Sequence, residues 1–360
     1  MKQETALTWS WLNCLTKRRY ETLKEVYGNL DHALEHLNED LLKSLGCRDE
    51  TLFKILNRYE EFDVKAYQTE LDRRGLRLIS TEDETYPSSL KEIGDPPIFL
   101  VYKGDLEILH QPCIGLVGTR EVSPYGKRVV EEFVPALVQA KMITVSGLAQ
   151  GIDTVVAQET LRAGGRTVAV LGHGLSMILP QSNGALAKEI IETGGLIMSE
   201  FPIDTPPDKH TFPARNRIIA GLTLGTVVFE APESSGALIT AELALEYGRE
   251  VFAVPGQIFD PNFAGCHKII GRGHAKLVTT PKDVLEEIGI VLSECEEQSL
   301  YTPKNPDEER LLSTLTTMPQ TMSTIIDRSG IDAGKINTSL TMMELAGAVK
   351  NVGNGEWVRT

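Results

Sequence analysis

Short apolar runs alternate with helical patterns through the middle of the chain. Each apolar run ends in a glycine-rich turn, and each turn leads into a segment with apolar residues at helical spacing. Runs of this length suit strands that are buried on both faces, as in a parallel sheet. We predict strands near residues 114–117, 142–146, 167–171, 196–199, 226–230, 250–254 and 276–278. We predict helices near residues 124–140, 153–163, 183–193, 214–222, 235–247 and 281–288.

This alternation predicts an α/β fold over residues 111–288, with a Rossmann-like, doubly wound, mostly parallel sheet. In open sheets of this kind, ligands bind beyond the carboxyl ends of the strands. The turns that follow the predicted strands are therefore the first place to look for function.

The flanking segments have different patterns. Residues 1–70 show apolar residues at helical spacing and predict a small helical domain, in which residues 42–46 resemble the turn of a SAM or helix-hairpin-helix domain. Such a turn can hold a phosphate on backbone amides. A helical interaction domain is the alternative that we favour. Residues 71–110 read as a connecting segment that leads into the core, with strands near 76–79 and 96–102.

The C-terminal part divides at an acidic stretch. Residues 289–306 contain Glu294, Glu296, Glu297, Pro303 and Pro306 and predict a linker. Residues 307–360 predict three helices and a hairpin, which make a winged helix. Its second and third helices would form a helix-turn-helix that reads duplex DNA. The tail has 7 acidic and 5 basic side chains, however, so we favour a protein contact.

Composition narrows the function classes. The net charge of −14 argues against binding nucleic acid by bulk charge, but the 14 basic and 16 acidic side chains of residues 111–280 nearly balance and leave room for a local basic site. The five cysteines are scattered without a CxxC pair, which predicts reduced thiols in a cytoplasmic protein. We expect neither a signal peptide nor a membrane span.

Three predicted strands end in turns that suit an anion. Gly118, Thr119 and Arg120 follow the first strand and combine a close backbone approach, a hydroxyl and a guanidinium. The segment from Ser146 to Asp153 follows the second strand, and we expect Asp153 to cap the next helix. Residues 172–174, Gly-His-Gly, follow the third.

Residues 209–217 are the most informative segment. Lys209, Arg215 and Arg217 supply cations, Asn216 an amide and Phe212 a ring. Cations interleaved with a stacking ring suit single-stranded nucleic acid. The alternative is a helix start whose arginines pair with acids such as Glu200 and Glu230.

Catalytic motifs are absent from the sequence. There is no GxSxG, HExxH or GxxxxGK[ST] pattern, and no histidine has an evident nucleophile or metal partner. We therefore expect no catalytic residue, metal or cofactor. An enzyme acting on a nucleotide or nucleoside phosphate stays open as the second hypothesis, because Rossmann-like folds host many functions.

Taken together, these motifs resemble the DprA/Smf family of DNA-processing proteins. The matching segments are Gly118–Arg120 with Ser123, Tyr125 and Gly126, then residues 146–153, 212–222, 235–241 and 248–256. They span about 114–288, and the two flanking domains also look like parts of the family. This chain departs at residues 172–181, where the family usually has a Gly-Cys-Gly and a basic residue after a proline; here these are His173 and Gln181.

The resemblance implies a non-enzymatic homodimer that binds single-stranded DNA and loads the RecA recombinase during natural transformation. The DNA-binding residues that it and the motifs indicate are Gly118, Thr119, Arg120, Ser123, Ser146, Gly147, Gly151, Lys209, Phe212, Arg215, Asn216 and Arg217.

Overall fold

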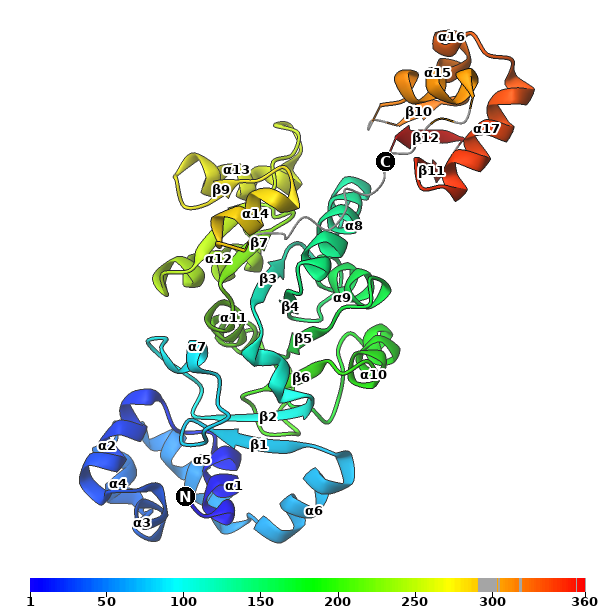
Figure 1. Cartoon of the computed structure of the whole chain (residues 1–360). Helices are drawn as coiled ribbons and strands as arrows, with labels where there is room; N and C mark the ends of the chain where they lie inside the picture. Colours follow the sequence, from blue (N-terminus) through cyan, green and yellow to red (C-terminus); the bar gives the residue numbers. More distant parts are fainter. Residues whose placement is uncertain (291–302, 304, 317–318, 354, 360) are drawn as a thin grey trace. The chain divides into compact units, whose positions relative to one another are not determined.

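The protein consists of two compact units, Met1–Val291 and Leu292–Thr360. We describe them from a computed structural model, which covers residues 1–290, 303, 305–316, 319–353 and 355–359 (Figure 1). Within these ranges, no helix is both long and apolar enough to cross a membrane.

Within residues 1–290, the strands form one nine-stranded sheet in the order β1-β2-β6-β5-β4-β3-β7-β8-β9. From β6 to β9 every neighbouring pair is parallel. The strands are β1 (Arg77–Ser80), β2 (Phe99–Gly104), β3 (Cys113–Val117), β4 (Ile143–Ser146), β5 (Thr167–Val170), β6 (Leu196–Ser199), β7 (Gly225–Val228), β8 (Glu250–Ala253) and β9 (Lys276–Leu277). The predicted Rossmann-like, mostly parallel fold is confirmed.

Residues 71–110 are part of this sheet and not merely a connection. β2 pairs antiparallel with β6, and β1 pairs antiparallel with β2. Residues 99–102 of β2 are buried. The prediction of a segment that only connects was therefore incomplete. Without β2, β6 would be the edge strand of the sheet, and its backbone groups would lack partners on that side.

Helices cover both faces of the sheet (Figure 1). Along β3, Ile114 and Leu116 belong to one apolar cluster and Cys113 and Val117 to another, since alternate side chains of a strand point to opposite faces. The first face is covered by α8 (Pro124–Gln139), α9 (Ile152–Arg162), α10 (Gly184–Glu192) and α14 (Pro281–Glu287). The second is covered by α7 (Ser88–Lys91), α11 (Thr211–Leu222), α12 (Gly236–Glu246) and α13 (Ala264–Gly271).

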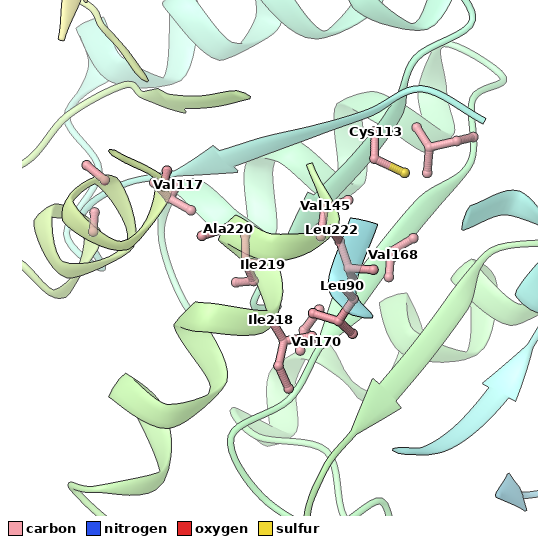
Figure 2. Close-up of a cluster of buried hydrophobic side chains, with 14 of the residues drawn as sticks. Leu90, Cys113, Val117, Val145, Val168, Val170, Ile218, Ile219, Ala220 and Leu222 are labelled. Atoms are coloured by element: carbon pink, nitrogen blue, oxygen red, sulfur yellow. The ribbon is translucent and has the colours of Figure 1, made fainter. Parts of the chain in front are cut away.

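The core beneath α11 is shown in Figure 2. Ile218, Ile219 and Leu222 pack with Leu90 of α7 and with valines of the sheet. A Cβ on Gly221 would lie 2.9 Å from side-chain atoms of Leu90 and Ile93, so this glycine lets α7 lie close against α11. The sequence pattern missed α13 and placed the start of α11 three residues too late.

The N-terminal helices are α1 (Gln3–Leu12), α2 (Lys17–Tyr27), α3 (Leu30–Glu35), α4 (Glu39–Ser44), α5 (Asp49–Glu60) and α6 (Val64–Arg74). A turn at Gly46, with φ of +73°, joins α4 to α5 as the sequence suggested. Their apolar core contains Trp9 and Leu42 but also Ile98 and Phe99 of the sheet region. They therefore pack into the same compact unit as the sheet.

The second unit has the predicted winged-helix elements. These are α15 (Pro306–Thr314), β10 (Gln320–Thr321), α16 (Met322–Ser329), α17 (Ala333–Leu345), β11 (Val349–Gly353) and β12 (Glu356–Arg359). Gly330, in the left-handed region, ends α16, and the Asp332 side chain caps α17. Most of the predicted acidic linker, with Glu294, Glu296 and Glu297, lies outside the described residues.

The division into two units predicts independent folding. A chain that ends at residue 291 should unfold cooperatively at the same temperature as the larger transition of the whole protein, because each unit has its own apolar core. Calorimetry of both chains would measure this. Loss of the cooperative transition in the shorter chain would show that the second unit is needed for the first to fold.

Candidate nucleic-acid interface

The candidate site lies beyond the carboxyl ends of the parallel strands, where the strand order reverses. From β3 the chain continues to β4 on one side, while β7 pairs with β3 on the other. This switch point is where open α/β sheets bind ligands. A cavity of about 270 Å³ opens there. It is lined by residues 117–120, Ala149, Asp153, Phe212, Arg215, Asn216, Ile219, Pro232, residues 235–237 and Thr240.

Two glycines allow the first two turns to press together. A Cβ on Gly118 would lie 2.5 Å from Cγ1 of Ile152, and one on Gly151 would lie 2.3 Å from the carbonyl oxygen of Thr119. The Ile152 amide donates to that same oxygen at 3.0 Å. Gly118, Thr119 and Gly151 thus fix the shape of the turn that presents Arg120.

Arg120 and the half-buried Phe212 form the outer part of the site. Arg120 is exposed, and its guanidinium carbon lies 5.1 Å from the centroid of the Phe212 ring. Gly172 packs closely against the Phe212 ring. A Cβ at residue 172 would lie only 2.9 Å from Cδ1 of the ring, so the close packing requires glycine there. Lys209 is exposed two residues before α11. A cation stacked on a ring at the sheet edge offers both a phosphate contact and a surface for a base.

Arg215 and Asn216, which the sequence predicted as DNA contacts, are buried. Nη1 of Arg215 donates to the carbonyl oxygen of Gly147 at 2.8 Å and also to that of Val170, and its Nε donates to Oδ1 of Asn216. The amide of Asn216 donates to the carbonyl oxygen of Gly236 at 3.2 Å. These two side chains hold the first turn of α11 against the strand ends.

Arg217 pairs with Glu200, as the alternative interpretation of this segment predicted. Its guanidinium forms a forked pair with Glu200, at 3.0 and 2.5 Å, and donates to Asp95 at 3.1 Å. The Arg217 and Glu200 side chains are only 15% and 13% exposed. Burial raises the pKa of Glu200, and the adjacent Arg217 acts in the opposite direction. The pair therefore belongs to the scaffold.

The N-terminus of α8 already holds a carboxylate of the protein. Glu230 follows β7 and is fully buried. The amide and hydroxyl of Ser123 both donate to its Oε2 at 3.0 Å, and Gly126 leaves room for it. Burial raises the pKa of Glu230, while these two hydrogen bonds lower it. Ser123, predicted to contact DNA, instead caps α8 and binds this carboxylate.

The turn that follows β4 also binds a carboxylate of the protein. The Asp153 carboxylate accepts from the amides of Gly147 at 2.9 Å and Ala149 at 3.4 Å. Asp153 lies in the first turn of α9 and is not its cap, which is Gly151. Gly147 has no room for a side chain, since a Cβ would lie 2.0 Å from Nη1 of Arg215. Gly147 and the buried Ser146, also predicted as DNA contacts, are therefore parts of the framework of the site.

The sequence predicted Asp153 as a helix cap and Glu230 as a partner of an arginine, and it missed that each carboxylate binds amides of a turn at the strand ends. An acid directly after a buried strand, or in the first turn of the next helix, is the signal that could have found Glu230 and Asp153. Of the predicted residues, Arg120 and Lys209 are exposed, and Phe212 is half-buried beneath Arg120.

Comparison with known proteins identifies the family. The family model of DNA recombination-mediator protein A matches residues 77–289, and that of the DprA winged helix domain matches residues 296–355. The chain belongs to the DprA/Smf family. Members of this family are DNA-processing recombination mediators.

Its relatives cover most of the chain. DNA processing protein DprA of Streptococcus pneumoniae is 41% identical over 273 residues, which are 76% of this chain and 94% of the relative. Protein Smf of Escherichia coli is 38% identical over 330 residues, covering 89% and 87%. The solved structure of Streptococcus pneumoniae DprA, 39% identical, has a TM-score of 0.68 and covers 79% of this chain and 98% of its own.

A second DprA structure concerns DNA. It is from Helicobacter pylori, is 26% identical, has a TM-score of 0.54 and covers 59% of this chain and 95% of its own. That structure describes a single-stranded DNA binding mode of the Helicobacter pylori protein.

The different roles of the arginines predict different effects on stability. Replacing Arg217 with Ala leaves Glu200 buried without its partner, and should lower the free energy of unfolding by about 3 kcal/mol. Replacing the exposed Arg120 with Ala should change it by less than about 0.5 kcal/mol. Urea unfolding of both variants measures the difference. Equal stability of the two variants would contradict the structural role of Arg217.

Proposed function

We propose that this protein is a non-enzymatic recombination mediator that binds single-stranded DNA at the Arg120–Phe212 site. The exposed guanidinium of Arg120, stacked on Phe212 at the sheet edge, is the observation that carries the proposal. A planar ring accepts any base by stacking, and a guanidinium binds phosphate by paired donors. The family, and the single-stranded DNA binding mode described for the Helicobacter pylori relative, support this choice of ligand.

The internal carboxylates weaken the alternative of a nucleotide enzyme. A Rossmann-like enzyme binds a nucleotide phosphate at the N-terminus of the helix after the first parallel strand. In this chain that helix is α8, and Glu230 occupies the place of the phosphate. A bound phosphate would have to displace a buried carboxylate or lie beside it, which costs free energy by charge repulsion.

The same arrangement explains how an acidic protein can bind DNA. Its framework anion sites are neutralised internally, so attraction to phosphate depends on a few exposed cations, among them Arg120 and Lys209. We therefore expect a strand to bind through stacking as much as through charge, and single-stranded DNA to bind more tightly than duplex, whose bases are not free to stack on a side chain.

The first test varies salt. Replacing Arg120 or Lys209 with Ala should weaken binding to every sequence alike and lower the dependence of log K on log salt by about one unit for each lost phosphate contact. Replacing Phe212 with Ala should weaken binding without changing that slope. Fluorescence titration of labelled dT oligomers, with duplex competitor, measures both quantities. Equal affinity for duplex and single strand at matched salt would refute the proposed ligand.

We further propose that the protein works as a homodimer that passes its DNA to the RecA recombinase, in the cytoplasm, during natural transformation. Two sites on one particle make the second contact intramolecular and raise avidity by about 10²-fold or more. On α12, Ala237, Leu238 and Ala244 are buried against the sheet, but Ile239 and Leu245 are exposed and available for a partner.

The dimer proposal has a direct test. Replacing Ile239 and Leu245 with Asp should give a monomer by light scattering, and should abolish the gain in affinity that longer oligomers provide. Val26→Asp, on an apolar residue of α2 that is more exposed than Ile239 and Leu245, is the control and should leave the mass unchanged. A monomer mass for the unaltered chain, with affinity independent of oligomer length, would reject the dimer.

The proposed RecA step is tested separately. On DNA coated with single-strand-binding protein, the chain should increase the rate of RecA-dependent strand exchange, and the Arg120→Ala variant should do so less. If the unaltered chain did not increase the rate of strand exchange, the proposed transfer to RecA would be wrong, while the proposal of DNA binding would be unaffected.

A further inference from the structure

The loop after β8 exposes two large apolar side chains at the tip of a closed turn. Phe259 is 92% and Ile258 78% exposed. They are the central residues of a turn that the Asp260 amide closes onto the carbonyl oxygen of Gln257 at 3.0 Å. Glycine, proline, asparagine and aspartate dominate such positions. An isoleucine and a phenylalanine held in water there stabilise nothing in the chain.

The base of this turn is firmly anchored. The Tyr125 hydroxyl donates to the carbonyl oxygen of Pro255 at 3.0 Å, and the His267 ring contacts the backbone of Gly256. Gly256 lies directly on the buried ring of Phe263, where a Cβ would be 2.1 Å from Cγ. The two apolar side chains are therefore presented by a fixed support.

The turn lies on the same edge of the sheet as the Arg120–Phe212 site. β8 is parallel to β7, and β7 is parallel to β3, so the carboxyl ends of all three meet at one edge. Two strand spacings separate β3 from β8, about 10 Å. The strand between them ends in the turn with Pro232 and Ser235, which already lines the cavity.

We propose that Phe259, supported by Ile258, is a second stacking position for the same single strand that binds at Arg120 and Phe212. The inference rests on the proposed function. An exposed aromatic ring offers a face to any base, and its neighbour adds apolar contact to the sugar. No lysine or arginine lies in residues 250–263, and Asp260 adjoins the ring. This position therefore contributes stacking without a phosphate contact.

The test compares short and long dT oligomers on the full chain. Phe259→Ala should leave binding of the shortest oligomers unchanged, weaken binding of longer ones roughly tenfold, and leave the salt slope unaltered. Phe259→Leu should bind long oligomers nearly as weakly as Phe259→Ala, because leucine is apolar but not planar. Phe259→Trp should keep the affinity, and its tryptophan emission should be quenched on binding. Long oligomers with abasic sites should bind the unaltered chain and Phe259→Ala equally.

Phe53→Ala is the matched control, since Phe53 on α5 is 58% exposed and far from this edge in sequence and in the fold. It should change none of these quantities. Unchanged long-oligomer binding in Phe259→Ala, while Arg120→Ala is weakened, would overturn this inference and leave the proposed function intact. Unchanged binding in both variants would overturn both. A smaller particle mass for Phe259→Ala in light scattering would overturn it too, because the turn would then contact a second copy of the chain.

Discussion

The buried guanidinium of Arg215 is the contact on which the candidate site depends. It joins the N-terminal part of α11 to the carbonyl groups of Gly147, just after β4, and Val170, the last residue of β5. A buried charge is stable only when its donors are satisfied. Here two backbone oxygens and Oδ1 of Asn216 accept from Arg215, and the charge of the nearby Asp153 favours the guanidinium. Because α11 is held in this way, Phe212 lies over Gly172 and under Arg120.

A second constraint is that the backbone amides at the sheet edge need negatively charged or polar acceptors. Parallel strands bring helix N-termini and free amides together there, and these attract anions. This chain supplies two of the anions itself, Glu230 at α8 and Asp153 at the turn after β4. The amides at this edge are therefore already bonded to carboxylates of the chain, and a ligand would meet mainly the few exposed side chains.

The flanking parts of the chain relate to the sheet in two ways. The N-terminal helices share an apolar core with Ile98 and Phe99, and β1 and β2 cover the edge of β6. Residues 1–110 thus contribute to the compactness of the first unit. The winged helix, by contrast, has its own core around Ile325, Ile336 and Trp357. The chain thus has one sheet edge that carries the candidate site and a second unit with a core of its own.

The sequence by itself determined the fold class and indicated where the candidate site lies. Apolar runs and glycine turns are local patterns, so β3 to β9, the winged helix and the positions of Arg120 and Phe212 could be read from them. What Arg215 and Arg217 do could not. They are two residues apart on one helix, and only the packing of α11 decides that one meets backbone oxygens and the other Glu200. The partners of Glu230 and Asp153, and the exposure of Phe259, depend likewise on contacts between distant segments, which local sequence does not encode.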